Sequence, residues 1–352
     1  MNRREALKAG LVALSALRAH AAGASVSTLI GTGSPGSSDR EVNNPYGLVI
    51  GPDQALYFCD LDNQRIRRFD PVSRQTRTIA GDGRKAYSGD GGLATAASLN
   101  MPHEIQFDSA GHLYIAERDN HVVRKVDGRT GIISTFAGTG VAGFSGDGGA
   151  ATTAQLRQPH SIAIDTKGRL LICDIGNHRI RSVDLSTGRI ETFGGTGERQ
   201  PTPDGAAVTG TPLNGPRTIA IDADGHLFLA LREGNAIYRI DRNTGRIHHV
   251  AGTGQQGYAG DGGPAGRAAL AGPKGLACAA GTLYVADTEN HVVRRIDLGS
   301  GIITTVLGTG RRGDGPEADP LQCALSRPHG VHAAGGKLYV GDSEAHRIRV
   351  LS

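Results

Sequence analysis

One unit is repeated along almost the whole sequence, and this repetition constrains the fold more than any other feature. Prolines open six similar segments, separated by 57 residues four times and then by 55: Pro45, Pro102, Pro159, Pro216, Pro273 and Pro328. Each copy contains four short apolar runs, which Gly, Asp and Asn clusters interrupt too often for helices. Four short strands per copy are typical of a propeller blade, so the sequence predicts an all-β, six-bladed β-propeller.

The apolar runs are nearly continuous, as in residues 47–50 and 161–164, and do not alternate with polar residues. Strands of this kind are covered on both faces, and here neighbouring blades would provide that cover. A lone four-stranded sheet would leave both faces wet, so we expect the copies to stack around an axis.

The sequence also predicts how the ring closes. The sixth copy ends at Ser352 after its third run and lacks a counterpart of residues 133–140, which close on Gly-Thr-Gly. A run of this kind is present near the other end of the chain, at residues 27–33. We therefore expect an N-terminal strand to complete the last blade and hide its edge, within one propeller domain at residues 25–352.

Residues 1–22 differ from the repeats and are expected to be a twin-arginine (Tat) signal peptide. Arg3 and Arg4 precede a short apolar run at residues 9–17, and Ala19-His20-Ala21 offers a small-residue cleavage site. The apolar run is too short to span a bilayer, and the alternative is an ordinary amphipathic helix. A Tat signal implies a protein that folds before export and is then periplasmic or secreted.

The charge of the repeats argues against nucleic acid as a partner. The chain has 38 basic and 34 acidic residues, of which residues 1–22 hold four basic residues and one acidic residue. The remaining net charge of +1 is spread over the blades without a basic helix. The repeats predict neither a membrane span nor a second domain, and we expect a monomer.

The four cysteines do not form a disulfide framework. Cys59 and Cys173 occupy the same repeat position two blades apart, where the other copies have Ala or Gly, which predicts buried free thiols. Cys278 lies in an inner strand and Cys323 lies in a loop. Their spacing leaves open whether these two cysteines pair.

The segment from Pro159 to Arg181 carries the pattern Pro-His-Ser-Ile-Ala-Ile-Asp, Gly-Arg-Leu-Leu-Ile-Cys-Asp and Asn-His-Arg-Ile-Arg. It resembles an NHL repeat, and related segments recur across residues 25–352. The glycine-rich stretch at residues 138–149 is similar to one in exported bacterial NHL proteins. The resemblance implies a propeller of NHL repeats, a fold used by protein-binding modules, by sensor domains and, in related six-bladed families, by lyases and lactonases.

Polar residues that recur at fixed repeat positions are expected to be structural. In the third copy, Asp174 ends the second run, His178 follows four residues later and Arg181 follows three residues after that. Because this set recurs, we expect a hydrogen-bonded lattice within the turns of each blade. The Gly-Asp-Gly-Gly loops lack a Walker lysine and alternating acids, which favours an Asp that caps a short helical turn.

The copies differ most informatively at the residue after each proline, which is expected at the mouth of the axial channel. We call these six side chains the channel ring: Tyr46, His103, His160, Arg217, Lys274 and His329. Large polar or aromatic side chains around one axis predict either a ligand pocket or a solvated rim. Arg217 and Lys274 would attract an anion and repel a dication. The ring therefore favours a scaffold that binds a small anionic ligand, or a peptide or protein, without a cofactor.

An enzyme is the alternative, because the ring resembles the site of peptidylglycine α-amidating lyase. That resemblance implies a zinc-dependent lyase or hydrolase with a metal ion on His103, His160 and His329. It also implies proton transfer by Tyr46 or Glu104, with a substrate carboxylate on Arg217.

Several features argue against metal enzymes of these kinds. The three histidines lie in blades two, three and six and not in the alternating blades of the lyase, which would leave a zinc cage incomplete. The channel ring contains no carboxylate, which argues against a lactonase that holds a hard cation. Blade four is the most divergent copy, with Leu231 and Tyr238 at the acid and arginine positions. A cell-envelope interaction surface without a small ligand is a third possibility.

Overall fold

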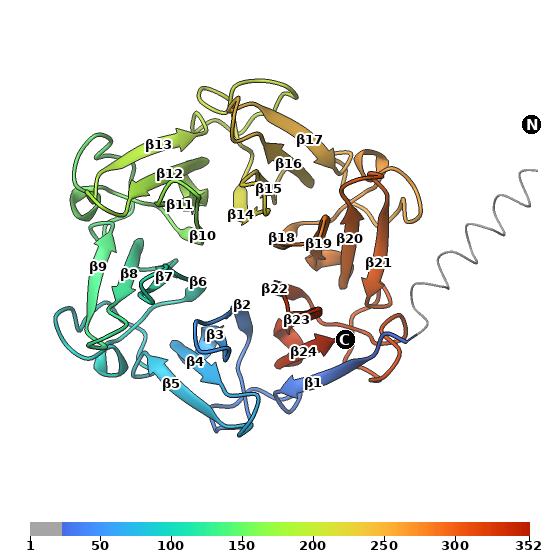
Figure 1. Ribbon diagram of the computed structural model, residues 1–352, viewed down its shortest axis with the longest axis horizontal. Coiled ribbons are helices and arrows are strands. Elements are labelled where there is room, and N and C mark those ends of the chain that lie inside the picture. The colour runs from blue at the N-terminus through green and yellow to red at the C-terminus, as the bar shows by residue number, and fades with distance from the viewer. Residues whose placement is uncertain (1–22) are drawn as a thin grey trace, which may run out of the picture.

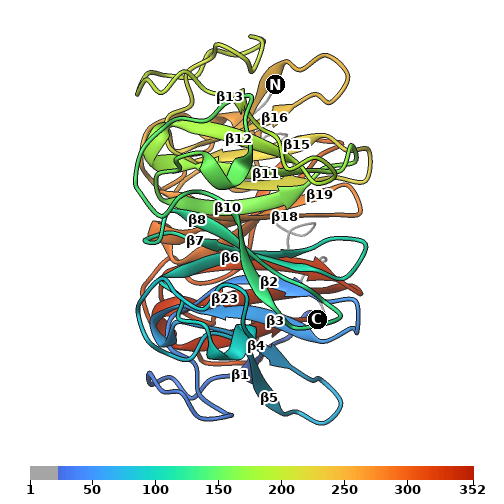
Figure 2. The ribbon, with the colours of Figure 1, turned by 90° about the vertical axis from the view of Figure 1, so that its left-hand side faces the viewer.

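The computed structural model describes residues 23–352, which form a ring of six four-stranded antiparallel sheets (Figures 1 and 2). We number these sheets blades one to six in chain order. This architecture confirms the predicted six-bladed propeller. Residues 1–22, which the sequence predicts to be a Tat signal, lie outside the described residues.

Each blade runs from an inner strand beside the axis to an outer strand at the rim (Figure 1). Blade one contains β2 (Pro45–Ile50), β3 (Leu56–Asp60), β4 (Arg65–Phe69) and β5 (Thr76–Ala80). Blade two contains β6 (Pro102–Phe107), β7 (Leu113–Glu117), β8 (Val122–Val126) and β9 (Ile133–Ala137). Blade three contains β10 (Pro159–Ile164), β11 (Arg169–Asp174), β12 (Arg179–Asp184) and β13 (Ile190–Gly194).

The remaining blades follow the same order. Blade four contains β14 (Pro216–Ile221), β15 (Leu227–Leu231), β16 (Ala236–Ile240) and β17 (Ile247–Ala251). Blade five contains β18 (Pro273–Ala279), β19 (Thr282–Asp287), β20 (Val292–Asp297) and β21 (Ile303–Leu307). Blade six contains β22 (Pro328–Ala334), β23 (Lys337–Asp342), β24 (Arg347–Leu351) and β1 (Val26–Ile30).

Short 3-10 helices lie in the linkers and after several second strands. They are η1 (Leu61–Asn63), η2 (Ala94–Ala96), η3 (Ala151–Thr153), η4 (Ile175–Asn177), η5 (Ala265–Arg267), η6 (Thr288–Asn290) and η7 (Ser343–Ala345). No helix within residues 23–352 is long and apolar enough to cross a membrane.

The ring is closed by a strand from the start of the repeat region, as the sequence predicts. β1 pairs antiparallel with β24, so that Val26 faces Leu351 and Ile30 faces Ile348 (Figure 1). The Val26 and Ile30 side chains are 1% and 5% exposed. β1 therefore covers the edge of β24 and adds apolar residues to blade six.

The apolar core lies between the blades. In residues 23–352, six clusters of buried apolar side chains each join two neighbouring blades. For example, Cys59 and Ile66 of blade one pack in the same cluster as Ile115 of blade two. The four cysteines are all free, so Cys278 and Cys323 are not bridged. The clusters between the blades confirm that each sheet depends on its neighbours to cover its apolar faces.

A buried arginine organises the outer half of most blades. In blade three, Arg181 is fully buried and lies 3.7 Å from Asp174 and 2.6 Å from Asp147. The Thr192 hydroxyl donates to the other oxygen of Asp147 at 2.7 Å. The in-blade link between acid and arginine is thus confirmed. The predicted capping role of the loop Asp is wrong, because the N-terminus of η3 has no side-chain cap and Asp147 pairs with Arg181 instead.

The repeated histidine joins neighbouring blades and does not complete a lattice within its own blade. Its Nδ1 atom accepts a hydrogen bond from the backbone N–H of the residue that precedes the proline of the next blade. The donor and acceptor pairs, at 3.1–3.2 Å, are Gln158 and His121, Gly215 and His178, Arg327 and His291, and Asn44 and His346. In blades one and four the side-chain oxygens of Gln64 and Asn235 accept the equivalent hydrogen bond. We call these contacts the interblade clasps. The expectation of a purely in-blade role for the histidine is therefore wrong.

The clasps predict a pH dependence of stability. Burial is the main factor that lowers the pKa of the four clasp histidines below its usual value. Below about pH 6.5 these histidines therefore bind more protons in the unfolded chain than in the folded chain. The stabilisation by the clasps is complete above that pH and is lost as the pH falls through the folded pKa values. Replacing all four histidines with Gln, the residue at position 64, is expected to preserve stability at pH 7.5 and to flatten its decline towards pH 5. Urea unfolding across this range measures the difference, and parallel pH profiles would contradict it.

Candidate functional site

The channel ring lies where each inner strand leaves regular pairing. The first residue of each inner strand, a proline, faces the acid or leucine that ends the second strand, and the register then shifts before regular pairing resumes. In blade four, for example, the irregularity lies between Pro216 and Thr218. Such a bulge re-aims the intervening side chain, which here is the channel-ring residue Arg217.

The channel ring is a packed layer and not a solvated rim. Five of its side chains are almost buried, with exposed fractions of 3% for His103, 8% for His160, 5% for Arg217, 5% for Lys274 and 4% for His329. A cavity of about 190 Å³ lies along the channel, lined by the third to sixth residues of the inner strands. Ring residues do not line this cavity, so the ring separates it from the end of the channel at which the inner strands begin.

Aromatic contacts join four members of the ring. The Tyr46 ring stacks on His329 at 4.1 Å and meets His103 edge-on at 4.8 Å. The His103 ring in turn meets His160 edge-on at 4.6 Å. The geometry brings the predicted residues together in one continuous arc.

Backbone hydrogen bonds fix the protonated nitrogen of each ring histidine. The Nδ1 atoms of His103, His160 and His329 donate to the carbonyl oxygens two residues earlier, at 2.8–3.1 Å. Their Nε2 atoms are therefore unprotonated acceptors. Burial is the main factor that holds the pKa of all three histidines well below its usual range. The charge of Arg217 adds to the shift for all three, and that of Lys274 for His103 and His329.

Half of the ring is satisfied by contacts within the protein. Lys274 Nζ lies 2.7 Å from Glu289 Oε1 and 3.3 Å from His329 Nε2, which is also 2.9 Å from the Tyr46 hydroxyl. Arg327 binds both carboxylate oxygens of Glu289, at 2.7 and 2.9 Å. Burial lowers the pKa of Lys274 to about 8, and its contact with Glu289 opposes this shift. The lysine is thus already paired with an internal carboxylate.

Arg217 has no such partner. Its side chain forms no hydrogen bond or ion pair with any other residue in the range 23–352, although only 5% of the residue is exposed. After burial, its charge is the strongest influence on the pKa values of Tyr46, His103 and His160. The guanidinium therefore acts on the ring as a cation without a counter-charge among the described residues.

Glu104 lies in the layer next to the ring and lines the channel cavity. Burial raises the pKa of Glu104 to about 7, while Arg217 and the backbone N–H of Ile105 oppose the shift. Glu104 forms no ion pair with the described part of the chain. A cavity-lining carboxyl that titrates near neutral pH can bind a cation or exchange a proton.

The ring histidines meet only part of what a zinc ion requires. Nδ1–H bonds to backbone carbonyls with free Nε2 atoms are a pattern found in metal-binding histidines. Across residues 23–352, however, no three or more His, Cys, Asp or Glu side chains are grouped so that they could hold a metal ion. His329 contacts Tyr46 and Lys274, and Tyr46 lies between it and His103. The three histidines therefore do not surround one point.

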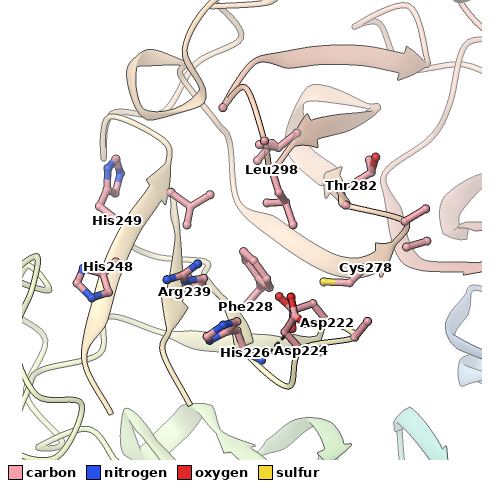
Figure 3. Close-up of a pocket in the computed structure, with 18 residues that line it drawn as sticks. Asp222, Asp224, His226, Phe228, Arg239, His248, His249, Cys278, Thr282 and Leu298 are labelled. Carbon is pink, nitrogen blue, oxygen red and sulfur yellow. Dashed lines mark hydrogen bonds between the residues drawn. The ribbon is translucent and has the colours of Figure 1, made fainter. Parts of the chain in front are cut away.

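A wider cavity of about 700 Å³ lies between blades four and five, and Figure 3 shows its lining. His226 and Phe228 face it from blade four, and Cys278 and Leu298 face it from blade five. The polar groups here belong to local turns, since the His226 N–H donates to Asp222 as His112 does to Asp108 in blade two. This cavity differs from the channel ring because Asp222 and His226 follow the ordinary turn pattern of the other blades.

The sheets and their closed ring define a six-bladed β-propeller, and the NHL repeat family model matches residues 156–181 and 325–351. The chain is therefore an NHL-repeat six-bladed β-propeller. It is 30% identical over 325 residues to the Arabidopsis thaliana protein SUPPRESSOR OF QUENCHING 1, chloroplastic, covering 88% of this chain and 30% of the relative. It is 25% identical over 294 residues to Homo sapiens NHL repeat-containing protein 2, covering 74% of this chain and 40% of the relative.

A solved structure with a similar fold is an auxiliary nutrient binding protein from Bacteroides ovatus. The TM-score is 0.67 at 17% identity, and the match covers 94% of this chain and 76% of the other. At this identity the likeness concerns the fold. The chain also spans well under half the length of the two curated relatives, so the similarity concerns only part of those proteins.

Two residues of the site were missed by the sequence reasoning, although the sequence carries signals for both. Glu289 follows the second-strand acid Asp287 by two residues, a position that is acidic in five of the six copies. Arg327 immediately precedes Pro328 and thus lies beside the ring position. Both signals lie in the turns next to the inner strand: Glu289 pairs with Lys274, and Arg327 holds Glu289.

Proposed function

We propose that this propeller is a binding scaffold that holds a small carboxylate-bearing ligand at the channel ring. The observation that carries the proposal is the buried guanidinium of Arg217, which lacks a partner in the described residues. A charge that is largely removed from water without a counter-charge is unfavourable, and a bound carboxylate would offset this cost. The Bacteroides ovatus neighbour is described as a nutrient binding protein, which agrees with this proposal.

Arg217 rather than Lys274 is the principal anion-binding residue in this proposal. Lys274 already donates to Glu289 at 2.7 Å, whereas Arg217 has all its donors available for a ligand. Guanidinium can also bind both oxygens of a carboxylate, which a lysine cannot. The two cations named from the sequence thus have different roles.

The Arg217→Ala variant is expected to lose at least about tenfold in affinity for acetate, because one charge-assisted hydrogen bond contributes about 1.5–3 kcal/mol. Arg217→Lys should retain part of the affinity, and Lys274→Ala should lose less than Arg217→Ala. Arg77→Ala, on an outer strand, removes the same charge far from the ring and is the matched control. Isothermal titration calorimetry at low salt measures all four variants. Equal acetate binding by wild type and Arg217→Ala would contradict the proposal.

We also propose that the protein is exported through the Tat route. The support is the arrangement of Arg3, Arg4, the apolar run and Ala19-His20-Ala21 in the sequence. Changing both arginines to lysine is expected to hold the unprocessed chain in the cytoplasm, because the receptor distinguishes the arginine pair from other cations. Cell fractionation followed by immunoblotting tests this, and unchanged export of the variant would rule out the Tat route.

A further inference from the structure

The unpartnered groups around the channel ring are not all donors. Arg217 offers a donor group, whereas His103 and His160 offer Nε2 acceptors that form no hydrogen bond within residues 23–352. Glu104 adds a carboxyl beside them, in the next layer of the channel. A simple anion would satisfy Arg217 but would leave these acceptors without donors. The site is therefore complementary to a ligand that carries both an acceptor and a donor.

Glu104 and Arg217 provide opposite charges that stay apart. The two side chains come from blades two and four, and their charged atoms are not within the 4.0 Å of an ion pair. Each nevertheless shifts the pKa of the other, so they influence each other through the channel. Two opposite charges held apart in a narrow, largely buried space are suited to a ligand with both charges.

The layer that contains Glu104 accommodates this carboxyl at a single position. The third residues of the six inner strands are Gly47, Glu104, Ser161, Thr218, Gly275 and Gly330. A Cβ atom at Gly47 would overlap with Glu104 Oε1, so the glycine of blade one makes room for the carboxyl of blade two. Glu104 is thus an individual feature of blade two within an otherwise small and uncharged layer.

We propose that the ligand is a small zwitterion of the α-amino acid class, with its carboxylate on Arg217 and its ammonium group on Glu104. The Nε2 atoms of His103 and His160 accept the remaining N–H groups of the ammonium. This inference rests on the proposed function, because it uses the same Arg217 contact for the carboxylate. Glu104 lines the channel cavity of about 190 Å³, whereas Arg217 lies in the adjoining ring, so the ligand lies where ring and cavity meet. Glycine and alanine are the smallest members of this class.

Three probes separate the charges of this ligand: glycine carries both, acetate only the carboxylate and methylamine only the ammonium. Isothermal titration calorimetry with the full chain at pH 7.5 is expected to show glycine binding at least about tenfold more tightly than acetate, and methylamine binding more weakly than glycine. This difference corresponds to one added charge-assisted contact. Glycine binding no tighter than acetate or methylamine would overturn the inference.

Variants assign the two ends of the ligand. Glu104→Gln keeps the side-chain volume and is expected to reduce the preference for glycine over acetate to less than about threefold, with acetate affinity retained. Glu104→Ser copies Ser161 of blade three and provides a second test if Gln disturbs packing. Arg217→Ala should lose both probes. A preference for glycine that survives in both Glu104 variants would overturn the inference.

The outcomes also distinguish this inference from the proposed function. If wild type binds acetate through Arg217 but does not prefer glycine, the carboxylate scaffold stands and the zwitterion inference falls. If neither acetate nor glycine binds, both are contradicted. Near-ultraviolet circular dichroism of each variant confirms that the propeller is folded before its affinity is compared.

Discussion

A chain that lacks residues 25–33 is expected to lose cooperative folding and to aggregate. The deletion removes β1, exposes the unpaired edge of β24 and removes the buried Val26 and Ile30 side chains from blade six. Loss of these two side chains alone should lower the free energy of unfolding by about 3–6 kcal/mol. Urea unfolding measures this loss, and light scattering coupled to gel filtration reports the association state.

A double variant, Val26→Ala with Ile30→Ala, separates side-chain burial from edge pairing. It keeps the backbone of β1 and is therefore expected to lose stability while remaining monomeric. The deleted chain, in contrast, should both lose stability and associate. A deleted chain that stays monomeric and unfolds at the parent's urea midpoint would show that β1 does not hold the ring together.

Removing Arg181 alone is expected to lower the free energy of unfolding by about 3–5 kcal/mol. The Arg181→Tyr substitution leaves the fully buried carboxylate of Asp174 without its cation. Tyrosine is chosen because blade four has Tyr238 at this position, where its hydroxyl donates to the Thr202 carbonyl at 2.9 Å. In blade three the corresponding carbonyl, that of Ser145, already accepts from Arg181 at 3.1 Å.

Blade four also provides the compensating changes. It has Leu231 and Gly234 where blade three has Asp174 and Asn177, so the acid and its amide partner are absent together with the arginine. The triple variant Asp174→Leu, Asn177→Gly and Arg181→Tyr is expected to recover at least half of the stability lost in Arg181→Tyr. A comparison of urea unfolding energies tests this coupling. A triple variant less stable than the single variant would contradict the account of blade four as a self-consistent replacement.

The repeat made the fold and the membership of the channel ring predictable from sequence. Because Pro45 and its five counterparts recur at nearly constant spacing, strand order, blade number and the place of Arg217 beside the axis all followed from one alignment of the chain with itself. Closure by β1 followed from the missing fourth run, although the strand begins at Val26, one residue before the predicted segment. Repeats specify which residues share a layer.

The chemical state of the ring could not be read from the repeat. Lys274 and Arg217 occupy equivalent positions, yet Lys274 is paired because Glu289 reaches it from a neighbouring turn and is itself held by Arg327. Arg217 has no such partner among the described residues. Burial of the ring depends on how six side chains of different size fill one layer. The spacing of the repeats in the sequence gives no information about this packing. The clasp role of His121 was missed for a similar reason, since its partner is a backbone N–H in the next blade.

The closure of blade six also has a kinetic consequence. Thr28 and Arg349 face each other across β1 and β24 but are separated by 321 residues of chain. During synthesis, β1 therefore emerges long before its partner and must remain unpaired until nearly all the other strands have been made. Contacts of such large sequence separation form late and slowly, because a long loop must close before they can form. The last folding step of this protein should accordingly be the docking of its first strand.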